Sequence, residues 1–177
     1  MRILAISGSL RARSSNTAVL LALKSLAPGG VSVELFEGLG ELPHFNPDVE
    51  EAALPAPAAA LRALVGECAA LMICSPEYAH GVPGALKNAL DWLVGGHEMV
   101  NKPVAVINAS AHSAFAHAQL LETLKTMSVS LVPYASITLP RRPASGDGSD
   151  VLADPALADP LRAALLYVVQ FAELASA

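Results

Sequence analysis

The chain has 177 residues, of which 53% are hydrophobic, and its formal net charge is −5. This length predicts a single domain over residues 1–177, and the negative charge argues against nucleic acid as a partner. No stretch reaches the roughly 18 apolar residues of a membrane helix, and the first residues show no signal-peptide pattern. We therefore expect a cytoplasmic protein that binds no membrane, with Cys68 and Cys74 as reduced thiols.

Short apolar runs alternate with segments of helical character along the chain. The expected strands are residues 3–6, 31–36, 71–74, 104–107 and 137–139. The expected helices are residues 17–26, 58–68, 85–93, 114–127 and 156–175. Strands that alternate with helices pair in parallel, and near-continuous apolar strands fit a sheet covered on both faces. The sequence therefore predicts an α/β fold, a flavodoxin-like doubly wound sheet of five parallel strands.

Two long connections interrupt this alternation. Residues 37–57 contain four prolines and are longer than ordinary loops, which predicts a functional role or an interface. Residues 141–155 are rich in Pro, Gly, Ser and Asp, and we expect them to be mobile.

The joint between the first expected strand and the first expected helix, residues 8–17, concentrates hydrogen-bond donors. It matches neither GxxxxGK[ST] nor GxGxxG. A helix N-terminus offers unpaired N–H groups and the positive end of a dipole, which favour a phosphate. The sequence predicts a loop around one terminal phosphate monoester, although simple helix capping uses the same residue types. The side-chain donors are Ser9, Arg11, Arg13, Ser14, Ser15, Asn16 and Thr17.

A second motif follows the third expected strand, at residues 75–84. Two prolines and two glycines restrict its backbone, so main-chain N–H and C=O groups can meet a planar ligand at fixed positions. Tyr78 adds a ring and a hydroxyl. Because ligands of such folds gather at the carboxyl ends of the strands, a functional loop is favoured over a purely structural one.

Both motifs carry a resemblance to a known family. The first is Gly8-Ser9-Leu10-Arg11 followed by Ser14-Ser15-Asn16, and the second is Pro76-Glu77-Tyr78 followed by Gly81-Val82-Pro83-Gly84 and, in the helix, Asp91-Trp92. From Met1 to about Leu139 the chain resembles the NAD(P)H-dependent FMN reductase family, which includes bacterial quinone, chromate and azo-dye reductases.

The resemblance implies where FMN would bind. The first loop would hold the phosphate, while the second loop and the loop after the fourth expected strand would lie beside the isoalloxazine ring. The implied cofactor-binding residues are Ser9, Arg11, Ser14, Ser15, Asn16, Thr17, Pro76, Glu77, Tyr78, Ala79, Ser110 and His112.

The resemblance also implies an activity. NADPH or NADH would pass hydride to bound FMN, which would reduce a small-molecule electron acceptor such as a quinone, an azo dye, chromate or free flavin. Because the flavin carries the chemistry, no catalytic side chain is expected, and the histidine spacing predicts no metal. Members of the family form homodimers or homotetramers, and residues 43–48 and 85–93 are the expected interface.

This chain departs from the family in the loop at residues 108–115. The family usually has a glycine pair there, whereas this chain has no glycine between Gly96 and Gly146. The alternative hypothesis is therefore a flavodoxin-like binding or regulatory protein with weakened flavin binding. His112 either donates to the flavin or faces solvent. Arg141 and Arg142 could meet the phosphate of NADPH, but a solvated loop is the better interpretation.

Overall fold

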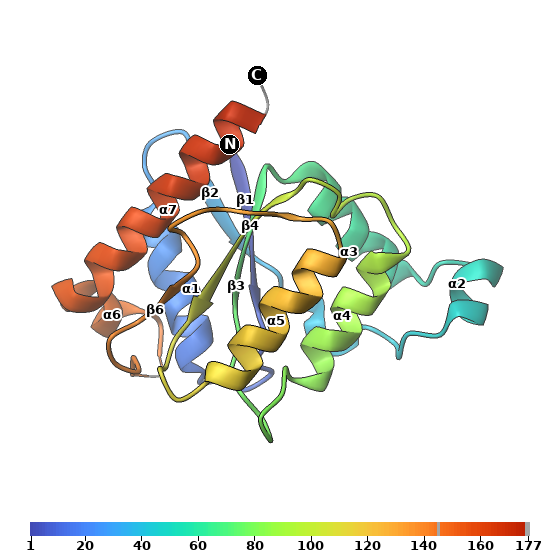
Figure 1. The fold of residues 1–177 in the computed structure, drawn as a ribbon, viewed down its shortest axis with the longest axis horizontal. Coiled ribbons are helices and arrows are strands. Elements are labelled where there is room, and N and C mark those ends of the chain that lie inside the picture. Colours follow the sequence, from blue (N-terminus) through green and yellow to red (C-terminus); the bar gives the residue numbers. More distant parts are fainter. Residues whose placement is uncertain (145, 176–177) are drawn as a thin grey trace.

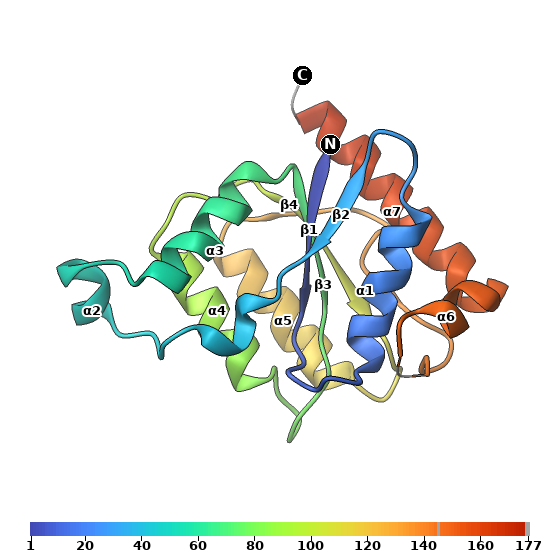
Figure 2. The same cartoon turned by 180° about the vertical axis from the view of Figure 1, so that it is seen from behind.

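The computed structural model describes residues 1–144 and 146–175. A parallel sheet forms the centre, with helices on both of its faces (Figures 1 and 2). Its strands follow the order β2-β1-β3-β4-β5, with β6 also paired to β4, which confirms the predicted flavodoxin-like topology. The strands are β1 (Arg2–Ser7), β2 (Ser32–Leu35), β3 (Ala70–Cys74), β4 (Pro103–Asn108), β5 (Ser130–Leu131) and β6 (Ile137–Thr138).

Each face of the sheet has its own hydrophobic core. Successive residues of a strand point to opposite faces, so Ile3 and Ala5 pack into one cluster while Leu4 and Ile6 pack into the other. The first cluster lies under α1 (Ser15–Leu26), α6 (Ser149–Ala153) and α7 (Pro155–Ala175). The second lies under α3 (Ala56–Glu67), α4 (Gly84–Val94) and α5 (Ala114–Thr126). Burial on both faces explains why β3 and β4 read as unbroken apolar runs.

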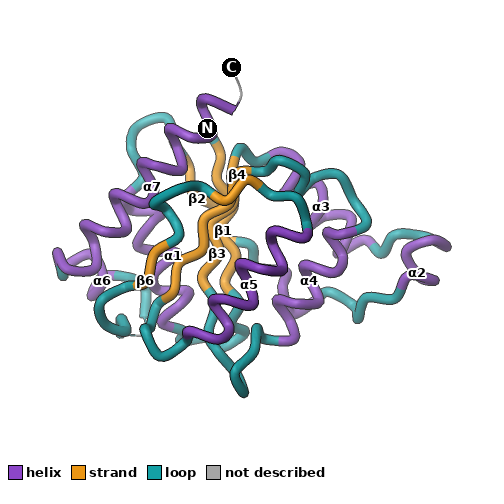
Figure 3. Tube along the Cα trace, viewed as in Figure 1, coloured by secondary structure: helices purple, strands orange, loops and turns teal. Residues whose placement is uncertain are grey.

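Two short strands share the fifth position of the sheet (Figure 3 colours the strands orange). β6 confirms the strand predicted at residues 137–139, but the sequence missed β5, which pairs with the start of β4. Between them the chain leaves the sheet, and Tyr134 adopts a left-handed φ of 63°. The hydroxyl of Ser136 accepts a hydrogen bond from the Val106 N–H at 3.1 Å. One side chain thus replaces a ladder bond that the interrupted strand cannot supply.

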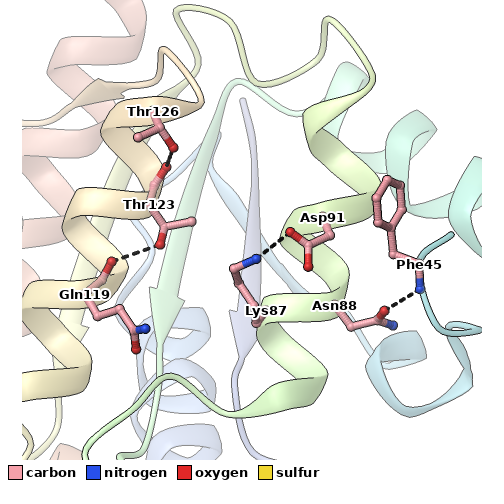
Figure 4. Close-up of polar contacts among 7 residues, drawn as sticks. All are labelled: Phe45, Lys87, Asn88, Asp91, Gln119, Thr123 and Thr126. Carbon is pink, nitrogen blue, oxygen red and sulfur yellow. Dashed lines mark hydrogen bonds and ion pairs between the residues drawn. The ribbon is translucent and has the colours of Figure 1, made fainter. Parts of the chain in front are cut away.

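The connection at residues 37–57 contains a 3₁₀ turn, η1 (Gly38–Glu41), and a short helix, α2 (Pro47–Ala52). α2 buries none of its residues and projects from the body of the molecule (Figure 2). Between η1 and α2 the connection is anchored on α4, where Asn88 accepts from the Phe45 N–H at 2.8 Å (Figure 4). The same figure shows an ion pair on α4 between Lys87 and Asp91, whose charged atoms lie 2.6 Å apart.

The segment predicted to be mobile, residues 141–155, contains α6 instead. Val151 is fully buried against α1 and α7, and Gly148 adopts a φ of 92° where the chain turns into α6. A five-residue helix lacks the long apolar period by which helices are found, so composition alone indicated a loop. Ser145 belongs to this segment but lies outside the described residues. Within residues 1–144 and 146–175, no helix combines the length and apolar character needed to cross a membrane.

Candidate functional site

A cavity of about 450 Å³ opens where β1, β3 and β4 end, a volume within the range of small-molecule sites. Of the twelve predicted cofactor-binding residues, ten line this cavity, and Thr17 and Ala79 do not. The cavity is also lined by Ala109 and Ser113, which were not predicted, and by Arg142, for which the sequence favoured a solvated loop. The predicted residues that line it are Ser9, Arg11, Ser14, Ser15, Asn16, Pro76, Glu77, Tyr78, Ser110 and His112.

Buried polar side chains concentrate around this cavity. In the described residues, every buried polar or charged residue lies at the end of β1, at the start of α1 or at the end of β4. Burying a polar group costs free energy unless it is hydrogen-bonded, so such a concentration is typical of a site rather than of a core. These residues are Ser7, Ser9, Ser14, Ser15, Asn16 and Asn108.

Part of the first loop serves the helix, as the capping interpretation predicts. Ser14 is the N-cap of α1, and its hydroxyl accepts from the N–H groups of Asn16 at 3.2 Å and Thr17 at 3.5 Å. The Thr17 hydroxyl shares a 2.8 Å hydrogen bond with Ser7, which explains why Thr17 does not reach the cavity. Ser14 thus caps the helix and also lines the cavity, whereas Thr17 has only a structural role.

The wall formed by the first loop is electropositive. The first turn of α1 has no acidic residue, and its N-terminus adds the positive end of the helix dipole. Arg11 and Arg142 both line the cavity, and Arg142 Nε lies 3.4 Å from the hydroxyl of Ser15. The N–H groups of Ala12 and Arg13 make no hydrogen bond in the part of the chain that the structure describes. Anions prefer such a combination of cations and unpaired amides.

Asn16 contributes an oriented amide to the same wall. Burial raises the pKa of the Cys74 thiol, which therefore stays protonated and donates to Asn16 Oδ1 at 3.3 Å. With its oxygen engaged in this way, Asn16 presents its Nδ2 group as the donor for a ligand.

The second wall is a tight hairpin at the end of β3. Tyr78 and Gly81 exchange two backbone hydrogen bonds, of 3.1 and 3.0 Å, and the two residues between them have positive φ values, 49° for Ala79 and 59° for His80. This is the geometry of a type I′ turn, which Asn and Gly favour. Ala79, in the turn itself, does not line the cavity, whereas Tyr78 lies on its wall and is half exposed.

Glu77 ties this hairpin to α5. One of its carboxylate oxygens accepts from the Ala116 N–H at 2.9 Å in the first turn of that helix. The other lies 3.5 Å from His80 Nδ1, and the His80 ring packs edge-on against Phe115 with ring centroids 4.5 Å apart. Glu77 therefore holds the second wall in place as well as lining the cavity.

Replacing Ala79 with glycine is expected to raise the free energy of unfolding by about 0.5–1 kcal/mol, because glycine adopts positive φ without the steric cost of a Cβ. Urea denaturation followed by circular dichroism measures this change. Ala53→Gly is the matched control, since Ala53 is exposed and has an extended φ of −168°, so there glycine should lower stability. Equal losses in both variants would contradict the assignment of strain to Ala79.

The third wall is the loop after β4. Asn108 Oδ1 accepts from the Ser110 N–H at 3.2 Å, and Ser110 Oγ accepts from the His112 N–H at 3.3 Å. These side-chain turns bring the loop to the cavity although it contains no glycine and has no residue with positive φ. His112 is exposed and lines the cavity, so it faces both the site and solvent.

Fold and site together define a flavodoxin-like α/β protein with a pocket at the carboxyl ends of its strands that arginine and serine side chains line. The model of the family described as NADPH-dependent FMN reductase matches residues 1–142, and the chain belongs to this family. An NAD(P)H-dependent FMN reductase of Pseudomonas aeruginosa is 38% identical over 113 residues, which span 63% of this chain and 60% of that protein. The match thus covers less than two thirds of that relative.

Two further relatives align over nearly the whole chain. A probable NADPH:quinone oxidoreductase of Oryza sativa is 30% identical over 183 residues, covering 97% of this chain and 89% of that protein. The solved structure of FerB, a flavoenzyme NAD(P)H:(acceptor) oxidoreductase from Paracoccus denitrificans, superposes with a TM-score of 0.80 at 27% identity. That superposition covers 98% of this chain and 97% of FerB.

The family name implies FMN and NAD(P)H, and the donor set of the cavity fits FMN. A phosphate monoester is an anion with several acceptor oxygens, and the first wall offers two arginines, buried hydroxyls and unpaired backbone amides. The second and third walls, with Pro76, Tyr78 and His112, offer flat and apolar surface suited to a ring system. One end of the cavity thus suits a phosphate and the rest suits a planar group.

Proposed function

We propose that the protein is an NAD(P)H-dependent, FMN-containing oxidoreductase that passes electrons from NADPH or NADH to quinones or similar acceptors, such as azo dyes, chromate or free flavin. The observation that carries the proposal is the cationic, hydroxyl-rich pocket at the carboxyl edge of a flavodoxin-like sheet. Membership of the FMN reductase family and the names of the relatives support the same activity.

In the proposed enzyme, each wall of the cavity contacts a different part of FMN. Ser9, Arg11 and Ser15 bind the phosphate, while Pro76 and Tyr78 position the ring system against the loop after β4. When bound, FMN supplies the hydride-accepting and electron-donating chemistry. The protein orients the ring and limits access to it, so the proposal assigns no general acid or base.

A flavin titration of the purified protein, followed by NADPH under anaerobic conditions, tests the activity. We expect FMN to bind and its absorbance near the visible maximum to bleach on addition of NADPH, with recovery on addition of a quinone. Absence of FMN binding would instead favour a flavodoxin-like binding or regulatory protein. Binding without bleaching would contradict the proposed reductase while leaving the cofactor assignment intact.

Replacing Arg11 with alanine is expected to weaken FMN binding by about 1.5–3 kcal/mol, the contribution of a hydrogen bond to a charged group. Fluorescence quenching of FMN gives the dissociation constant. Arg13→Ala is the matched control, because Arg13 lies in the same loop, is exposed and does not line the cavity. If both variants bind FMN like the unmodified protein, Arg11 is not a phosphate ligand.

The proposal includes a homodimer or homotetramer in the cytoplasm. The projecting connection that carries α2 supports the assembly, because none of the α2 residues is buried in the single chain. Sedimentation velocity measures the assembly state directly.

A further inference from the structure

We propose that Arg142 is a phosphate-binding residue of the FMN site, reaching the first loop from the opposite end of the chain. This inference rests on the proposed function. Arg142 lines the same cavity as Arg11, and its Nε lies 3.4 Å from Ser15 Oγ, across 127 positions of sequence. Ser15 is the first residue of α1 and is buried, so Arg142 lies at the electropositive end of that helix.

Arg142 is an exposed residue, but residues before and after it pack against the body of the molecule. Before it, the Leu139 N–H donates to the Asn108 carbonyl at 2.9 Å, and the Leu139 side chain is fully buried. After it, Pro143 is buried and Gly148 packs against the backbone of α1. A guanidinium on a segment held in this way loses less conformational entropy on binding than one on a free loop.

The adjacent residues Arg141 and Arg142 differ in the charged groups that surround them. Arg141 forms an ion pair with Asp154 and does not line the cavity. Arg142 has no ion pair with a carboxylate in the described residues; it lies at the N-terminus of α1 and lines the cavity together with Arg11. Arg11 and Arg142 carry charges of like sign on one cavity, and the carboxylate that also lines it, Glu77, already accepts from the Ala116 N–H and lies beside His80. An anion bound beside both arginines would remove the repulsion between them. A phosphate group fits this arrangement better than a neutral ligand.

A residue that binds only the phosphate must discriminate between FMN and riboflavin, which carry the same ring system. We expect Arg142→Ala to raise the FMN dissociation constant about 10–100-fold. Riboflavin binding should change less than twofold, since riboflavin has no phosphate. Arg142→Lys should recover part of the FMN affinity because it keeps the charge but loses the fork of donors.

The experiment compares the dissociation constants of FMN and riboflavin, from fluorescence quenching, for the unmodified protein and for Arg142→Ala, Arg142→Lys and Arg141→Ala. Arg141→Ala is the matched control and should bind both flavins like the unmodified protein. Circular dichroism checks that each variant is folded. Unchanged FMN binding in Arg142→Ala, or an equal loss for both flavins, would overturn the assignment of Arg142 to the phosphate. If the unmodified protein binds neither flavin, the proposed function fails and this inference with it.

Discussion

Replacing Trp92 with alanine is expected to lower the free energy of unfolding by about 3–5 kcal/mol, as for other large aromatic side chains removed from a core. Trp92 lies on α4, is fully buried and packs edge-on against Phe45, with ring centroids 5.1 Å apart. Its Nε1 donates to the Pro43 carbonyl at 2.7 Å. The substitution would therefore open a cavity and release the connection that leads to α2.

Trp92→Phe separates the two contributions. Phenylalanine keeps most of the apolar volume, and the Pro43 carbonyl keeps its second donor, Asn88 Nδ2, at 2.9 Å. We expect a loss of about 1–2 kcal/mol for this variant. Urea denaturation followed by far-ultraviolet circular dichroism gives both values. A loss for Trp92→Ala no larger than that for Trp92→Phe would contradict a packing role for the indole.

Replacing Gly148 with alanine is expected to lower the free energy of unfolding by about 2–5 kcal/mol. Gly148 has a φ of 92°, which a residue with a Cβ rarely adopts. A Cβ there would lie 2.7 Å from the Ala18 carbonyl oxygen and 2.9 Å from the Ala22 nitrogen, both backbone atoms of α1. Backbone atoms cannot rotate away like the end of a side chain, so α6 would have to move off α1.

Two other glycines separate conformational strain from close contact. Gly30 has a φ of 83°, but a Cβ added there would meet no atom within 4 Å. Gly30→Ala should therefore lower the free energy of unfolding by about 1 kcal/mol, from backbone strain alone. Gly146 has neither a positive φ nor a close neighbour, and Gly146→Ala should leave stability within the error of the measurement. Thermal denaturation of the three variants should rank them in that order. A Gly148 variant as stable as the Gly30 variant would mean that α6 does not approach α1 as closely as described.

The hydrophobic pattern predicted the central strands and the long helices. A strand that is buried on both faces needs apolar residues at consecutive positions, which makes it easy to recognise in the sequence. β3 and β4 are entirely buried, and the sequence shows them as unbroken apolar runs. β5 has only two residues, both partly exposed, so no pattern marks it. The start of α2 could have been recognised in the sequence, because an Asn N-cap (Asn46) followed by a proline in the first turn (Pro47) is typical of helix starts.

The candidate site was predictable where its residues follow strands directly. Ser9, Glu77 and Ser110 come just after the ends of β1, β3 and β4, and the topology of the fold brings such positions together. Arg142 was not predictable, because its place depends on how the last described strand pairs with β4, and composition suggested a solvated loop. Ala79 follows Tyr78 in sequence, but it lies in a left-handed turn and does not line the cavity, which the sequence did not indicate.

The part of the connection that forms α2 is structurally separate from the sheet and from the cavity of the single chain. α2 contributes no residue to the core or to the cavity lining, and an ion pair between Glu50 and Arg62 ties it to α3. β1, β2 and the first loop of the site precede α2 in the sequence, and the other strands and site loops follow it. A second domain inserted within α2 would therefore leave the sheet of each chain intact, and any loss of assembly in such a fusion would report on the interface proposed for this connection.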